Sequence, residues 1–74
     1  MDEKRKFYLF VNVGCIRVLG VPMYRAEVIA WYADQKYPDG VWFETELFAS
    51  KAYPINKAFE WIDEHKLKEG VNYE

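Results

Sequence analysis

Along residues 7–18, FYLFVNVGCIRV, alternate positions form one apolar face and one mixed face, with the period of two that is typical of a β-strand. The odd positions from Phe7 to Cys15 are all apolar, whereas Asn12 and Gly14 interrupt the even positions. The stretch is rich in aromatic and β-branched residues, which favour strands. The pattern therefore predicts a strand over 7–18 whose odd face lies in the core.

A second pair of strands is predicted around the segment Tyr37-Pro38-Asp39-Gly40. Proline at the second position and glycine at the left-handed position are typical of a hairpin turn closed by a bulge. The sequence VWFETELF after the turn favours a strand, and a hairpin needs another strand before it. We expect strands at 23–37 and 41–49. A helix over 22–36, beginning at Pro22, is the alternative.

The turn also predicts a register for this hairpin. If Tyr37 pairs with Val41, alternate residues of the two strands fall on two separate faces. The residues that this register assigns to the core are Ile29, Trp31, Val41, Phe43 and Leu47. The register assigns Tyr32 and Trp42 to the opposite face.

One helix is predicted near the end of the chain, over residues 54–68. Pro54 suits a first helical position, and Ile55, Ala58, Phe59 and Ile62 follow helical spacing along one stripe. Gly70 is a candidate C-terminal cap, so residues 70–74 are expected to form a partly ordered tail.

Together these elements predict a small α+β domain of the order β-β-β-α. A three-stranded antiparallel sheet (7–18, 23–37, 41–49) is covered on one face by the C-terminal helix. The whole chain, 1–74, forms this single domain, with a charged N-terminal arm over 1–6. If residues 22–36 were helical, the order would instead be β-α-β-α.

Composition sets limits on the function. A 74-residue chain buries a modest core, and a hydrophobic content of 51% and an aromatic content of 19% are high enough to form one. The net charge of −2 lacks the basic excess that is typical of nucleic-acid binders. With one cysteine and one histidine, the chain can form neither an internal disulfide nor a four-ligand zinc site of these residues.

The chemistry-bearing residues form no recognised catalytic motif. His65 lies one position after Glu64 without a second histidine, and we interpret it as a residue of the helix end. Cys15 is expected to be a small buried residue of the first strand. The sequence contains no glycine-rich phosphate loop. We therefore expect no enzyme activity, no cofactor and no metal site.

The N-terminal stretch has a superficial likeness to a lipoprotein signal, with Lys4-Arg5-Lys6 before an apolar run that ends at Cys15. Asn12 and Arg17 break this pattern, because a signal requires an uninterrupted apolar segment. No stretch is long and apolar enough for a membrane span. A cytoplasmic location without membrane contact is therefore expected, and it suits a single cysteine.

The sheet face opposite the predicted helix is the candidate functional site. Its aromatic residues would leave an unusually large apolar area in water, and Tyr and Trp often contribute most of the binding energy at interfaces. The residues assigned to this partner-binding face are Tyr8, Phe10, Tyr32, Asp34, Lys36, Trp42, Glu44, Glu46 and Phe48.

This face predicts a small non-enzymatic protein-binding module, an inhibitor or adaptor, with an inhibitor of the phage or mobile-element type as one form. Its acidic side chains point to a basic protein partner, and such a face can mimic nucleic acid. Two alternatives remain: a sheet-face nucleic-acid-binding domain, and a plain homo-oligomeric domain in which two aromatic faces bury each other.

Overall fold

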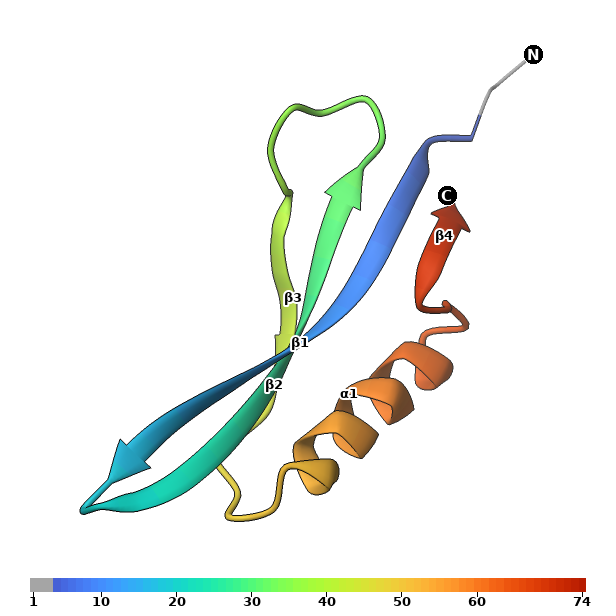
Figure 1. Cartoon of the computed structure of the whole chain (residues 1–74). Coiled ribbons are helices and arrows are strands. Elements are labelled where there is room, and N and C mark those ends of the chain that lie inside the picture. Colours follow the sequence, from blue (N-terminus) through green and yellow to red (C-terminus); the bar gives the residue numbers. More distant parts are fainter. Residues whose placement is uncertain (1–3) are drawn as a thin grey trace.

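The computed structural model describes residues 4–74 as a four-stranded antiparallel sheet with one helix on one face (Figure 1). The strands are β1 (Lys6–Val18), β2 (Val21–Tyr32), β3 (Gly40–Glu44) and β4 (Gly70–Tyr73), and the helix is α1 (Ala52–Glu64). Across the sheet the strands follow the order β3-β2-β1-β4. The α+β class is confirmed, but the expectation of three strands was wrong, because the supposed tail forms β4. Residues 1–3 of the predicted arm lie outside the described residues.

A long hairpin of β1 and β2 forms the centre of the sheet. Its register runs without a shift from Phe7↔Tyr32 to Val18↔Val21. Leu19 and Gly20 make the two-residue turn with φ values of 52° and 81°. Two consecutive positive φ angles are typical of the type I′ turn, whose twist matches that of the flanking strands. Residues 21–32 are therefore a strand, and the alternative of a helix over 22–36 was wrong.

The pairing of β2 with β3 differs from the predicted register. Ala30 pairs with Gly40 and Ile29 with Val41, and a bulge then shifts the register so that Val28 pairs with Phe43. Tyr37 therefore does not pair with Val41. Residues 33–39 form a wide connection in place of a tight turn. Just after β3, Thr45 N–H donates to the Ala26 carbonyl at 2.9 Å, and Phe48 then bridges to Tyr24.

The core lies between α1 and one face of the sheet. Its buried hydrophobic residues are Phe7, Leu9, Ala26, Val28, Ala30, Tyr32, Ala58 and Ile62. The odd face of β1 was correctly predicted to belong to the core. From β2, however, the even positions are buried, and three of them are the small residues Ala26, Val28 and Ala30. Small side chains allow the helix to approach the sheet closely.

Three of the predicted core residues lie on the other face of the sheet. By their register, Ile29, Trp31 and Val41 face away from α1. Of the remaining two, Phe43 packs against the core cluster, and Leu47 is half-buried beyond the end of β3. These three residues share one face, as predicted, but α1 covers the even residues of β2, on the opposite face.

Helix α1 begins two residues before the predicted start and ends four residues before the predicted end. Its termination is a Schellman motif: Leu67 N–H donates to the Ile62 carbonyl and Lys66 N–H donates to the Asp63 carbonyl, at 3.0 Å each. Lys66 occupies the left-handed position, with φ of 57°, that was predicted for Gly70. Gly70 instead opens β4. Among the described residues, no helix has the length and apolar character needed to cross a membrane.

The alternation along β1 predicts losses of stability of different size for two neighbouring substitutions. Leu9 is 0% exposed and Phe10 is 47% exposed. Leu9→Ala is expected to lower the free energy of unfolding by about 2–5 kcal/mol, because it leaves a cavity in the core. Phe10→Ala is expected to lower it by less than about 1.5 kcal/mol. Urea unfolding followed by circular dichroism checks this, and equal losses would contradict the assigned faces.

Candidate interaction face

The sheet face away from α1 carries two apolar rows that run across the strands. Cross-strand pairs place Val71, Tyr8 and Trp31 side by side in the first row. Phe10, Ile29 and Val41 lie side by side in the second. The rings of Tyr8 and Phe10 stack with their centroids 6.3 Å apart, which joins the rows. We call these six residues the aromatic band.

Only one side of the sheet is covered by α1 (Figure 1). None of the six residues of the aromatic band belongs to the buried core cluster. Phe10 and Val41 remain 47% and 50% exposed, and the other four are half-buried. Within residues 4–74 no second layer packs on this face, so the aromatic band is a contiguous apolar surface in contact with solvent.

Polar residues border the aromatic band on the side of the β1–β2 turn. Asn12 Nδ2 donates to Glu27 Oε1 at 3.1 Å. Arg25 Nη1 lies 3.6 Å from Glu44 Oε1 in an exposed ion pair. Arg25 therefore compensates the charge of Glu44, whereas Glu27 keeps its negative charge and is held by the neutral amide of Asn12.

The structure brings together only some of the predicted face residues. Tyr8, Phe10 and Glu44 lie on the open face. Tyr32 and Trp42 lie on the helix side, Asp34 and Lys36 belong to the 33–39 connection, and Glu46 and Phe48 follow β3. The predicted acidic-aromatic face is thus divided among four places.

Trp42 faces the core because it is the extra residue of the bulge in β3. Its ring centroid lies 5.4 Å from that of Phe7 and 6.3 Å from that of Tyr32. Its indole Nε1 donates to Asp39 Oδ2 at 2.8 Å. The bulge lets Phe43 face the helix side as well, where its ring stacks on Trp61. Trp31 and Trp42 have therefore exchanged the faces that the sequence predicted for them.

Four residues of the aromatic band were missed by the sequence prediction: Ile29, Trp31, Val41 and Val71. A signal for two of them was present in β2. Arg25 and Glu27 share the odd positions of Ile29 and Trp31, and two charged residues at these positions indicate a face in contact with water. Val71 had no local signal, because its place depends on the pairing of β4 with β1.

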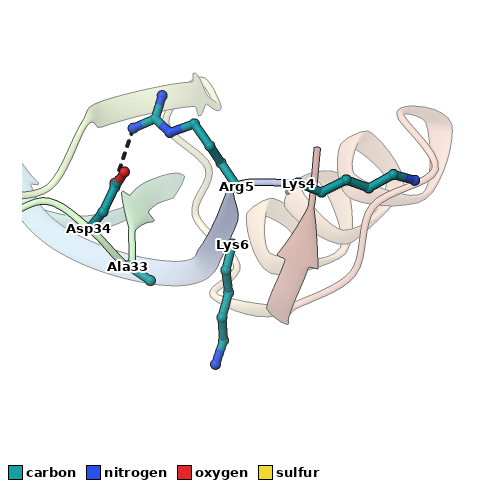
Figure 2. A pocket seen from close by; sticks show the side chains of 5 residues that line it. All are labelled: Lys4, Arg5, Lys6, Ala33 and Asp34. Carbon is teal, nitrogen blue, oxygen red and sulfur yellow. Dashed lines mark hydrogen bonds and ion pairs between the residues drawn. The ribbon is translucent and has the colours of Figure 1, made fainter. Parts of the chain in front are cut away.

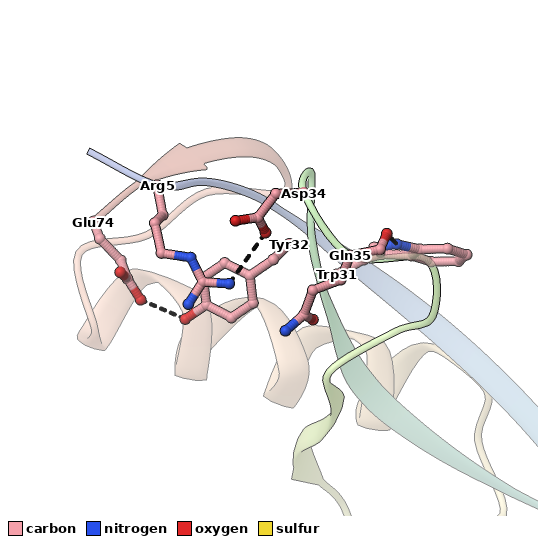
Figure 3. A network of polar contacts seen from close by, with 6 residues as sticks. All are labelled: Arg5, Trp31, Tyr32, Asp34, Gln35 and Glu74. Carbon is pink, nitrogen blue, oxygen red and sulfur yellow. Dashed lines mark hydrogen bonds and ion pairs between the residues drawn. The ribbon is translucent and has the colours of Figure 1, made fainter. Parts of the chain in front are cut away.

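A polar network ties both ends of the described chain to the end of β2 (Figure 3). Arg5 Nη2 donates to Asp34 Oδ1 at 3.1 Å, which raises the pKa of the Arg5 guanidinium. The same guanidinium lies 3.8 Å from the centroid of the Tyr32 ring. Tyr32 Oη donates to Glu74 Oε1. This hydrogen bond, with burial and the charge of Glu74, raises the pKa of Tyr32.

Two shallow hollows mark the surface. One, of about 360 Å³, is lined by Lys4, Arg5, Lys6, Ala33 and Asp34. Figure 2 shows that its basic side chains point in different directions and that Arg5 turns toward Asp34, so they do not converge on one anion. The other, of about 330 Å³, lies beside Glu46, Phe48 and Lys57. Thr45 also lines this second hollow, where its hydroxyl accepts from Ala26 N–H at 3.0 Å and donates to the Glu46 carbonyl at 2.9 Å.

The remaining candidate residues have structural contacts. His65 Nδ1 lies 2.8 Å from the Trp61 carbonyl oxygen, and its ring stacks on Trp61 at the helix end.

Cys15 is exposed, so the prediction that it is buried was wrong. Among residues 4–74, the His, Cys, Asp and Glu side chains form no group of three or more that could hold a metal ion.

Comparisons with family models, with curated proteins and with solved structures found no match to this chain.

The Tyr32–Glu74 hydrogen bond predicts a loss of stability at high pH. Folding raises the pKa of Tyr32 above its ordinary value of 10.0, so the neutral phenol is favoured in the folded protein. This contribution is complete below pH 10.0 and is lost as the pH rises through the higher pKa of the folded state. Tyr32→Phe is expected to reduce the dependence of stability on pH above that value.

Urea unfolding at a series of pH values between about 8 and 11.5 measures this dependence, and that range brackets the titration of tyrosine. Tyr73→Phe is the matched control, because it also removes one phenol hydroxyl but leaves the Tyr32–Glu74 hydrogen bond in place. The same slope in wild type and Tyr32→Phe would contradict the assigned role of this hydrogen bond.

Proposed function

We propose that this chain is a small non-enzymatic protein-binding module, of the inhibitor or adaptor kind, which docks on a protein through the aromatic band. The observation that carries the proposal is the pair of contiguous apolar rows on a sheet face that no described element covers. Monomeric proteins rarely leave such a surface in water without a use for it. Tyr8, Phe10 and Trp31 supply the large, rigid aromatic area that often contributes most at interfaces.

The charges around the aromatic band support a partner with an apolar surface. Glu27 and Glu44 both have polar partners on this face, and Asp34 lies away from it in an ion pair with Arg5. A basic partner was expected because Asp34, Glu44 and Glu46 were predicted to surround the aromatic residues. Since Glu27 is, within residues 4–74, the one acid on this face that keeps an unpaired charge, we propose apolar contact as the main source of binding energy. The partner we propose therefore presents an amphipathic segment whose apolar side lies on the aromatic band.

A nucleic-acid partner has less support. Bases can stack on exposed rings, but single-strand binders combine such rings with a positively charged groove. The chain has a net charge of −2, and Arg25 on this face is paired with Glu44. The basic side chains of Lys4 and Lys6 point in different directions (Figure 2).

The proposal predicts that charges in the aromatic band abolish partner capture. Wild type, Phe10→Asp and Val41→Asp are immobilised as baits for native lysate, with and without nuclease, and captured proteins are quantified by mass spectrometry. A specific protein partner is expected to survive nuclease and to fall at least about tenfold with either variant, because a buried unpaired charge is costly. Tyr37→Asp is the matched control, since Tyr37 is 70% exposed in the 33–39 connection.

Salt dependence then distinguishes apolar from ionic recognition. Capture is expected to persist as the sodium chloride concentration rises, because salt screens exposed ion pairs but does not weaken apolar contact. A partner that Phe10→Asp and Val41→Asp retain would contradict the proposed face. Capture of nucleic acid alone, lost with nuclease, would replace the proposal with the nucleic-acid alternative.

A further inference from the structure

The long strand β1 has an edge that is paired over only part of its length. On the side away from β2, β4 pairs with residues Lys6 to Leu9 and then ends. Within residues 4–74, no strand pairs with residues 10–18 on that side. In Figure 1 the lower half of β1 runs toward its turn with no ribbon along this edge.

The alternation of backbone hydrogen bonds along β1 shows which residues have N–H and C=O groups that point to this edge. Ala33 N–H donates to the Lys6 carbonyl at 2.9 Å, so the even residues of β1 bond to β2. Glu74 N–H donates to the Arg5 carbonyl at 3.0 Å, so the odd residues bond on the other side. Since the β1–β2 register has no shift, the odd residues keep this direction to the turn. The residues with outward N–H and C=O groups are Val11, Val13, Cys15 and Arg17.

This edge lacks the features that usually prevent pairing between chains. Natural edge strands are commonly protected by charged side chains, proline or bulges. On β2, Pro22 has that role, because the even residues of β2 bond outward, as Tyr24 N–H does to the Phe48 carbonyl at 2.7 Å. Residues 10–18 of β1 contain no proline and no bulge, and Arg17 is their only charge.

Gly14 lies at the midpoint of the unpaired edge, and nothing within its own chain requires a glycine there. A Cβ at this position would meet no atom within 4 Å, and its φ is outside the left-handed region. Glycine within a strand weakens it and often marks a place where another backbone approaches closely. The close approach of a backbone from another molecule would account for the glycine at position 14.

We propose that two copies of this chain pair antiparallel through residues 10–18 of β1, with a two-fold axis at Gly14. In this register Val13 pairs with Cys15 of the other copy, and Val11 pairs with Arg17. All of these residues present outward N–H and C=O groups, so each pair can exchange two backbone hydrogen bonds. The two Gly14 residues then form the close, non-hydrogen-bonded pair at the axis.

The unpaired edge of β1 is long enough for the same segment of a second copy. The register ends where Phe10 pairs with Val18 of the other copy, because the outer side of Leu9 is already paired with Gly70 of β4. The turn of each copy therefore reaches the end of β4 in its partner, and the whole unpaired segment is filled. Leu19 is 99% exposed in the single chain, and this contact would cover it. Phe10 and Val18, also exposed, become cross-strand neighbours.

The dimer forms one continuous eight-stranded sheet with both helices on the same side, because facing residues of antiparallel strands point to the same face. The two aromatic bands remain open on the opposite side. The inference is independent of the proposed function, and its tests use only purified protein.

A disulfide trap tests the register. Gly14→Cys in a Cys15→Ala background places the two new thiols at the axis, where Cα atoms are about 4.5 Å apart, within the range for a disulfide. Mild oxidation is expected to give a covalent dimer. Asn12→Cys in the same background is the control, because its neighbour in the other copy is Ile16. A cross-link that forms equally in both variants, or in neither, overturns the register.

A proline substitution tests the edge itself. Cys15→Pro removes one outward N–H and leaves the bonds to β2 intact, whereas Cys15→Ala keeps that N–H. Analytical ultracentrifugation is expected to show dimers for wild type and Cys15→Ala, and a dissociation constant raised at least about tenfold for Cys15→Pro. A wild type that stays monomeric overturns the proposal. So does a folded Cys15→Pro that dimerises equally well. If Cys15→Pro fails to fold, the disulfide trap decides.

Discussion

The packing of α1 on the small even residues of β2 is the interaction on which the rest of the structure depends. Ala26, Ala30 and Ala58 are each fully buried, so helix and sheet approach closely there. Because strand side chains alternate, burying this set turns every odd residue of β2 away from the helix. The register with β1 and β3 then assembles the aromatic band from residues of all four strands. The open face is thus a direct consequence of which side of β2 the helix covers.

Features that depend on neighbouring residues could be predicted from the sequence, whereas features that depend on contacts between distant segments could not. The core face of β1 was predictable because its odd positions are uniformly apolar. In β2 the larger residues Ile29 and Trp31 suggested the core, but the close approach of a helix selects small side chains. The Pro38-Asp39-Gly40 segment suggested a tight turn, yet the β1–β2 register and the bulge at Trp42 determine the pairing. The sequence therefore predicted an open sheet face, but six of the nine residues that it assigned to this face lie elsewhere.

The same difference between local patterns and long-range contacts is seen in the C-terminal part of the chain. Helical spacing predicted α1 well, but its end depends on Lys66 in a left-handed conformation that glycine adopts more readily. Strand β4 was missed because its pairing with β1 is long-range. Its fixed position also relies on Asn72, which is buried and exchanges hydrogen bonds of 2.9 and 2.7 Å with the backbone of Lys68. Only the folded chain brings these groups together.

Nuclear Overhauser effects measure directly which face of β2 packs against α1. With methyl-labelled protein, the account predicts cross-peaks from the Ala58 and Ile62 methyl groups to those of Val28 and the neighbouring alanines. It also predicts cross-peaks between the rings of Trp42 and Phe7. Cross-peaks from the helix methyl groups to Ile29 and Trp31 instead would contradict the account, since the aromatic band would then be core.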